Sequence, residues 1–111
     1  MQLDALVREL GLKVQCAGGN LGREVTGGYV GDLLSDVMAN SKEGDIWITR
    51  QVHQNIVAVA GLKDLAGIVL IQGCEPAPDT AAKAEAEGIP ILVTDLPAFE
   101  IVGRIYALLN P

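Results

Sequence analysis

Aromatic residues are scarce in this chain of 111 residues: they make up 4% of it, although half of the residues are hydrophobic. The core must therefore be built from Val, Ile, Leu and Ala. That composition is typical of buried parallel strands covered by helices. Aromatic platforms on which nucleic-acid bases could stack are not expected.

Positive charge is also scarce, because eight Lys and Arg residues stand against fourteen Asp and Glu residues and the net charge is −6. Nucleic-acid affinity depends mainly on Lys and Arg side chains that displace counterions from the phosphate backbone. We therefore expect no nucleic-acid partner.

Long apolar runs are missing too. No run approaches the roughly 18 residues of a membrane-spanning helix, and residues 1–10 alternate at helical spacing instead of forming a signal peptide. We expect a cytoplasmic protein that does not bind membranes. Cys16 and Cys74 lie far apart in a chain long enough to fold without a disulfide, so reduced thiols are expected.

The length is that of one domain, and no linker or low-complexity segment divides the chain, so we expect a single domain over residues 1–111. Apolar runs at 46–48, 67–71 and 89–93 alternate with stretches at helical spacing, which predicts three consecutive βα units. The run 67–71 has no polar residue, as in a central strand covered on both faces. The predicted fold class is α/β: a three-layer sandwich with a mainly parallel sheet and helices on both faces.

The same patterns predict the individual elements. Further strands are expected at 12–16 and at 23–29, the latter interrupted by Gly27-Gly28, and one or two helical turns at 31–38. Helices are expected at 3–10, 54–62, 79–87 and 97–109, with Asp79 as an N-terminal cap and Gly11 and Gly88 as C-terminal caps. The apolar face of the last helix is predicted to consist of Phe99, Val102, Ile105, Tyr106 and Leu109.

Residues 23–38 contain Thr26-Gly27-Gly28 followed by Gly31-Asp32, and they resemble the signature of the DRTGG domain family. Glu24 and Val25 stand where the family name would place Asp and Arg. Residues 44–49 and 88–94 also fit, so the resemblance extends over nearly the whole chain. DRTGG domains are similar to the amino-terminal domain of HPr kinase/phosphorylase and, more distantly, of Mur ligases. The resemblance implies an accessory module that serves regulation or dimerisation beside a separate partner enzyme.

Motifs for catalysis are not found. The glycine-rich residues 17–22 are followed neither by Gly-Lys-Ser/Thr nor by a predicted helix, so they are interpreted as a turn and not as a phosphate-binding loop. A metal site would need the single histidine, His53, to converge with Cys74 and a carboxylate such as Asp95, and no ligand spacing supports one. We expect no catalytic residues, no metal and no cofactor.

The carboxyl ends of neighbouring parallel strands share one edge of a sheet, which is where such folds bind ligands. Arg50 could hold a phosphate or carboxylate there with two hydrogen bonds. The plainer alternative is that these polar loop ends only face water. The candidate ligand-binding residues at this edge are Thr49, Arg50, Gln51, His53, Gln72, Gly73, Thr94 and Asp95.

Two hypotheses follow. The first is a non-catalytic regulatory or ligand-sensing domain that binds a small anionic metabolite, for example a nucleotide, at the carboxyl edge. The second is a homodimerisation or protein-interaction module. Its apolar surface is expected around Val25, Tyr29, Leu33, Leu34 and Val37. An enzyme that works alone is the third and least supported interpretation.

Overall fold

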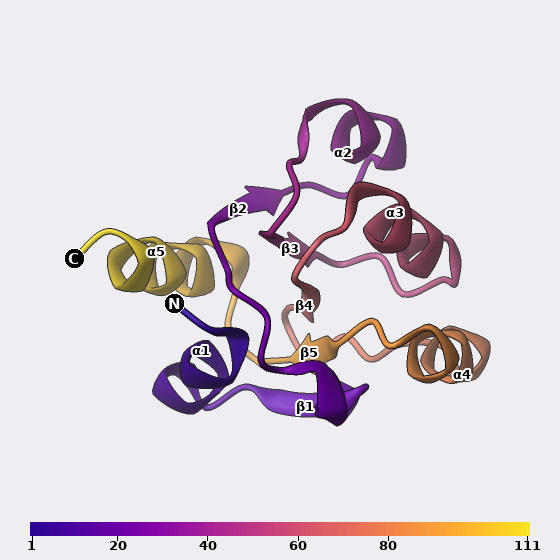
Figure 1. Ribbon diagram of the computed structural model, residues 1–111, viewed down its shortest axis with the longest axis horizontal. Coiled ribbons are helices and arrows are strands. Elements are labelled where there is room, and N and C mark those ends of the chain that lie inside the picture. The colour runs from indigo at the N-terminus through magenta and orange to yellow at the C-terminus, as the bar shows by residue number, and fades with distance from the viewer.

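The structure, a computed structural model, describes all residues from 1 to 111 and is built around a five-stranded sheet of order β1-β5-β4-β3-β2 (Figure 1). Strands β2 to β5 are parallel and lie side by side in chain order, whereas β1 is antiparallel to β5. The strands are β1 (Lys13–Cys16), β2 (Gly27–Val30), β3 (Asp45–Thr49), β4 (Gly67–Leu70) and β5 (Ile91–Val93).

Helices cover both faces of this sheet, and Figure 1 shows α2, α3 and α4 on one side and α1 and α5 on the other. Crossovers between neighbouring parallel strands that follow one another in sequence are right-handed, which places α2, α3 and α4 on the same face. The predicted α/β sandwich with a mainly parallel sheet is confirmed. None of the helices has both the length and the apolar character needed to cross a membrane. The helices are α1 (Leu3–Leu10), α2 (Leu34–Asn40), α3 (Asn55–Lys63), α4 (Pro78–Glu87) and α5 (Ala98–Leu109).

The three inner strands β3, β4 and β5 have every residue buried. The only tryptophan, Trp47, lies fully buried in β3, and its indole N–H donates a hydrogen bond of 2.9 Å to the carbonyl oxygen of Gly31. A buried indole needs such a partner, because an unpaired donor in the core would be destabilising. This bond ties β3 to the loop that follows β2.

The edge strand β2 differs from its prediction. It begins at Gly27 and includes both glycines, because a Cβ atom at Gly27 would lie 2.9 Å from a carboxylate oxygen of Asp45 in β3. Gly27 therefore allows the close pairing of β2 with β3, and neither glycine interrupts the strand. Arg23 and Val25 are bonded instead to the amino-terminal segment, since the Leu3 N–H donates to Arg23 and the Val25 N–H donates to Met1, each over 2.8 Å.

Two helix predictions need correction. Asp79 is not the N-terminal cap of α4, because Ala77 occupies the cap position and the helix begins at Pro78. Proline suits the first position of a helix, since it has no N–H that would need a partner there. The predicted face of α5 is wrong in part: Phe99 and Tyr106 are 95% and 69% exposed, whereas Ile105 is buried and Val102 and Leu109 pack against the core. The apolar stripe of α5 is wider than the strip of sheet beneath it, and Ile101 and Ile105 are the residues that are buried.

The apolar surface predicted for dimerisation is wrong as well. Val25 and Val37 are buried in the core at 2% and 0% exposure, and Tyr29 and Leu34 pack against the cluster beneath α2 and α3. Only Leu33 among the five is well exposed. The large exposed apolar side chains near β2 belong instead to the strand end and to α5.

Gly61 offers a test of the helical geometry of α3. It is exposed, a Cβ atom there would meet nothing within 4 Å, and its backbone is helical, so Gly61→Ala should raise the free energy of unfolding by about 0.5–1 kcal/mol. Gly67→Ala in β4 is the contrasting variant, because its Cβ would lie 3.3 Å from Leu3 and 3.4 Å from the Pro90 carbonyl oxygen. Urea denaturation should show opposite signs for the two variants. A destabilised Gly61→Ala protein would contradict the described helix.

Candidate functional site

The carboxyl ends of β2 to β5 meet at one edge of the sheet. The register places Thr49 opposite Leu70 and Leu70 opposite Val93, so the loops that follow these strands are neighbours, as the sequence predicts. Because β1 is antiparallel, it starts at this same edge, and Lys13 lies opposite Val93. The edge therefore gains a cation that belongs to none of the predicted loops.

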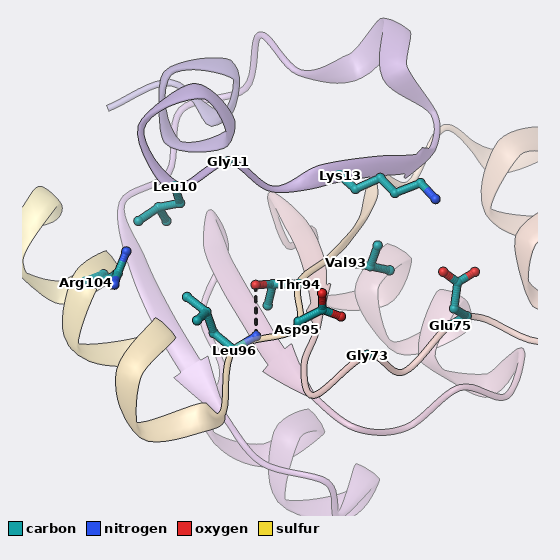
Figure 2. Close-up of a pocket in the computed structure, with 10 residues that line it drawn as sticks. All are labelled: Leu10, Gly11, Lys13, Gly73, Glu75, Val93, Thr94, Asp95, Leu96 and Arg104. Carbon is teal, nitrogen blue, oxygen red and sulfur yellow. Dashed lines mark hydrogen bonds between the residues drawn. The ribbon is translucent and has the colours of Figure 1, made fainter.

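A cavity of about 520 Å³ opens between the loops after β4 and β5 (Figure 2). The chain leaves β4 toward α4 on one face and leaves β5 toward α5 on the other, so the two loops diverge and leave a crevice between them. Open α/β sheets bind their ligands at such points. The cavity is lined by Leu10, Gly11, Lys13, Gly73, Glu75, Val93, Thr94, Asp95, Leu96 and Arg104.

Four charged side chains line this cavity, the cations Lys13 and Arg104 and the carboxylates Glu75 and Asp95. Figure 2 shows Thr94 and Asp95 in its middle, with Lys13 on β1 and Arg104 on α5 at its sides. Lys13 is exposed and takes part in no ion pair, whereas Arg104 pairs with Glu100 one turn earlier in α5. The Asp95 carboxylate is exposed. An unpaired ammonium group beside a carboxylate and backbone groups can bind a ligand that carries both an anionic group and hydroxyls.

The loop after β4 is held rigidly against the loop after β5. Gln72 and Gly73 both have left-handed backbones, with φ of 55° and 73°. Their N–H groups donate 3.0 Å hydrogen bonds to the carbonyl oxygens of Leu96 and Thr94, respectively. The Thr94 hydroxyl accepts a further 3.2 Å bond from the Leu96 N–H. Left-handed backbone at a non-glycine residue such as Gln72 is strained and is common at functional sites, and here it holds the turn that places Gly73 against the cavity.

Asp32 organises the loop after β3. One oxygen of its carboxylate accepts hydrogen bonds from the Thr49 hydroxyl at 2.7 Å and from the Arg50 N–H at 2.8 Å. The Gln51 side-chain amide donates to the Asp32 carbonyl oxygen, and the Thr49 hydroxyl accepts a bond from the Gln51 N–H. The hydroxyl of the buried Thr49 is thus already engaged. The guanidinium of Arg50 stays exposed and unpaired.

The predicted site residues divide between two hollows. Gly73, Thr94 and Asp95 line the large cavity. Arg50 and Gln51 line a second hollow of about 290 Å³ together with Asp32 and Cys74. His53 and Gln72 are exposed and line neither, and Thr49 lies beneath the surface.

Lys13 and Arg104 were missed by sequence reasoning. Lys13 reaches the edge only because β1 is antiparallel and pairs with β5, and Arg104 lies beyond the first turn of α5. The alternation of polar and apolar residues in 12–16 indicates that Lys13 points away from the core, but strand order cannot be read from that pattern.

The residues of the family motif lie at both ends of β2, some at its amino-terminal end and some after its carboxyl end. Gly31 and Asp32 lie at the carboxyl edge, whereas Thr26 begins the amino-terminal end of β2 and its hydroxyl donates a 3.3 Å bond to the Glu43 carbonyl oxygen. Gly44, at φ 83°, packs so tightly on Thr26 that a Cβ atom there would clash with the hydroxyl. Thr26 and Gly27 therefore shape the pairing of β2 with β3, and none of Thr26, Gly27 and Gly28 lines the large cavity.

One other polar contact stabilises the molecule away from the carboxyl ends of the strands. Tyr29 donates a hydrogen bond to Asp36 in α2. This bond is the main cause of the raised pKa of the Tyr29 phenol, and burial is the second cause. Both cysteines are free, and burial, followed by the nearby Glu85, raises the pKa of the Cys16 thiol. No three His, Cys, Asp or Glu side chains lie close enough together to hold a metal ion.

The family model of the DRTGG domain matches residues 5–108 of the chain. Among solved structures, the chain is similar to the CBS and DRTGG domains of the regulatory region of Clostridium perfringens pyrophosphatase, complexed with its activator, diadenosine tetraphosphate. The TM-score is 0.67 at 19% sequence identity, which shows a shared fold. The likeness covers 91% of this chain and 46% of the other, so this chain spans about half of that regulatory region. No curated protein matches the chain.

Asp32→Ala should detach the loop after β3. Loss of the two bonds that the carboxylate accepts is expected to lower the free energy of unfolding by about 1–2 kcal/mol and to speed hydrogen exchange at the Arg50 amide. Asp95→Ala is the matched control, because Asp95 makes no hydrogen bond or ion pair and its removal should change stability by less than about 0.5 kcal/mol. Equal effects of the two variants would contradict the organising role of Asp32.

The two thiols should differ in reactivity. Near neutral pH, Ellman's reagent should label the half-buried Cys74 quickly and the buried Cys16 only after unfolding, because the Cys16 thiol resists ionisation. Cys74→Ser should abolish the fast phase and Cys16→Ala should preserve it. Rapid labelling of both thiols in the native protein would refute this.

The raised pKa of Cys16 in the folded state also predicts a pH dependence of stability. Above the ordinary thiol pKa of 9.0, Cys16 loses its proton more readily in the unfolded chain than in the folded chain, so the free energy of unfolding should fall as the pH rises.

Proposed function

This chain belongs to the DRTGG domain family, and on that premise we propose that it is a regulatory, ligand-sensing domain that binds a small anionic metabolite in the cavity between the loops after β4 and β5. The observation that carries the proposal is that the unpaired Lys13 lines the same cavity as Thr94 and Asp95, at the point where those two loops diverge. The cavity has a volume of about 520 Å³, which lies within the roughly 300–1,000 Å³ that is usual for small-molecule sites.

The cavity can hold an anion in spite of the net charge of −6, because Lys13 and Arg104 offset the two carboxylates, Glu75 and Asp95, that also line it. Fields of distant surface charges are screened over roughly 10 Å, so the groups at the edge decide what is bound. Lys13 and Arg104 offer cationic donors on two sides of the cavity. Arg50 offers a third, beyond Cys74 in the neighbouring hollow. A ligand with two separated anionic groups could reach both hollows.

A nucleotide is the ligand class that best matches the remaining groups. The Asp95 carboxylate can accept hydrogen bonds from ribose hydroxyls, and Lys13 can bind a phosphate as a point charge. The similar regulatory region of pyrophosphatase has a nucleotide, diadenosine tetraphosphate, as its activator, which supports this class for the present chain.

The proposed domain acts on a partner enzyme and performs no reaction itself. Its support is the setting of the structural neighbour, in which a DRTGG domain belongs to the regulatory region of an enzyme. Ligand binding at the edge would alter the loops after β3, β4 and β5 together, because backbone hydrogen bonds link them. Gln72 and Gly73 join the loops after β4 and β5, and the Ala77 N–H donates a 3.0 Å bond to the Val52 carbonyl oxygen in the loop after β3. A ligand that favours one arrangement of these linked loops can thereby change the surface that the domain presents to its partner enzyme.

Calorimetry and thermal-shift measurements with AMP, ATP and diadenosine tetraphosphate test the proposal. A bound nucleotide at 100 times its Kd should stabilise the fold by about 2.7 kcal/mol and raise the Tm by several degrees. Lys13→Ala should weaken that binding about tenfold or more, because a charge-assisted bond to phosphate is lost. Arg50→Ala should weaken only a ligand long enough to reach the second hollow.

Lys63→Ala is the matched control. Lys63 is also free of ion pairs, but it ends α3 at the opposite edge of the sheet, so the same loss of charge should leave nucleotide affinity unchanged. If none of the three nucleotides binds, or if Lys63→Ala and Lys13→Ala weaken binding equally, the cavity is not the nucleotide site.

A further inference from the structure

We propose that a second copy of this chain docks on the surface formed by α5 and the edge strand β2, with Phe99 of each copy filling the groove between β2 and α5 of the other. This dimer contact lies on a different face from the surface that the sequence suggested and away from the large cavity. It is therefore independent of the proposed ligand site.

Phe99 is the most exposed large apolar side chain in the molecule, at 95%. It is also the only phenylalanine of the chain. Tyr106 follows seven residues later on the same side of α5 and is 69% exposed, and Val30 at the end of β2 is 49% exposed. Single exposed apolar residues are common, but these three line one continuous hollow with Val102, which is typical of an interaction surface.

The groove beside this hollow has a volume of about 300 Å³ and lies between β2 and α5. Gly27 and Gly28 form its strand side, and Gly28, whose Cβ atom would face Ile46 and Ile48 on the α5 side of the sheet, leaves the groove open. Val102, Ile105 and Leu109 form its helix side. An apolar cavity of roughly 150 Å³ is enough to hold a benzene ring, so the groove can accept a phenyl side chain.

The exposed ring and the groove are parts of one surface, since both include Val30, Val102 and Tyr106. A two-fold interface requires a surface that is complementary to itself, so that each copy offers the feature that the other accepts. When Phe99 of each copy fills the partner's groove, both rings and both grooves are used. A single contact with an unrelated protein would use either the ring or the groove.

The area available is adequate for such a contact. A large aromatic side chain can bury roughly 150–250 Å², so Phe99 and Tyr106 of both copies together could bury roughly 600 Å². The flanking Val30, Val102 and β2 backbone extend this toward the roughly 1,000 Å² that specific interfaces need. The edge of β2 is open to a partner, because β2 pairs only with β3 and carries neither charge nor proline.

Charge favours this face for self-association. Each copy has a net charge of −6, so most approaches of two copies are repulsive. No residue that lines the groove or the hollow beside Phe99 is charged. Contact there brings no like charges directly together.

Sedimentation equilibrium of the whole chain at roughly 100 μM, a concentration that saturates contacts of low micromolar Kd, tests the proposal. The expected mass is twice the monomer mass of 11.7 kDa. Phe99→Asp should weaken the dimer at least tenfold, because it removes the ring from the contact and one carboxylate per copy would have to be buried in an apolar groove. The exposed position of Phe99 means that the monomer fold should survive, which circular dichroism checks.

Leu62→Asp is the control, because Leu62 is 75% exposed on α3, on the other face of the sheet, and its replacement should leave the dimer intact. Phe99→Asp should still bind any nucleotide that the wild-type chain binds, and Lys13→Ala should still dimerise, so the two proposals fail separately. A wild-type chain that is monomeric at this concentration, or a dimer that persists in Phe99→Asp, would overturn the proposed interface.

Discussion

Both faces of the inner strands β3, β4 and β5 are buried, and this constraint shapes the rest of the molecule. A strand such as β4, whose four residues are all buried, is stable only if helices cover the sheet from above and below. The parallel crossovers supply α2, α3 and α4 to one face only. The other face has to be covered by the two ends of the chain, and α1 and α5 pack there through Leu3, Leu6, Ile101 and Ile105.

The candidate site follows from this arrangement. Because α5 must return to the face opposite α4, the loops after β4 and β5 leave the sheet in opposite directions and the large cavity opens between them. Because α1 precedes β1 on that same face, β1 joins the sheet antiparallel to β5 and its first residue, Lys13, reaches the cavity. The binding groups are thus positioned by the need to cover the second face of the sheet.

The motif that carries the family resemblance has two separate structural roles. Gly27 allows close pairing of β2 with β3, and Gly28 leaves the groove beside α5 open, so the importance of both comes from a missing side chain. Gly31 and Asp32 act through hydrogen bonds, since they receive the Trp47 indole and hold the loop after β3. One short stretch of sequence therefore influences the dimer surface that we propose and the edge that we propose for ligands.

The sequence by itself determined the fold class, the inner strands and most helix positions, because apolar periodicity and burial on two faces are local properties that leave a clear pattern. It also indicated that Gly73, Thr94 and Asp95 would be neighbours, since parallel strands end at one edge. Only the tertiary structure decided that Lys13 and Arg104 join them, and that Phe99 and Tyr106 face outward while Val25 and Val37 do not. Strand order and the rotation of a helix about its axis depend on contacts between distant segments, and no local pattern records those contacts.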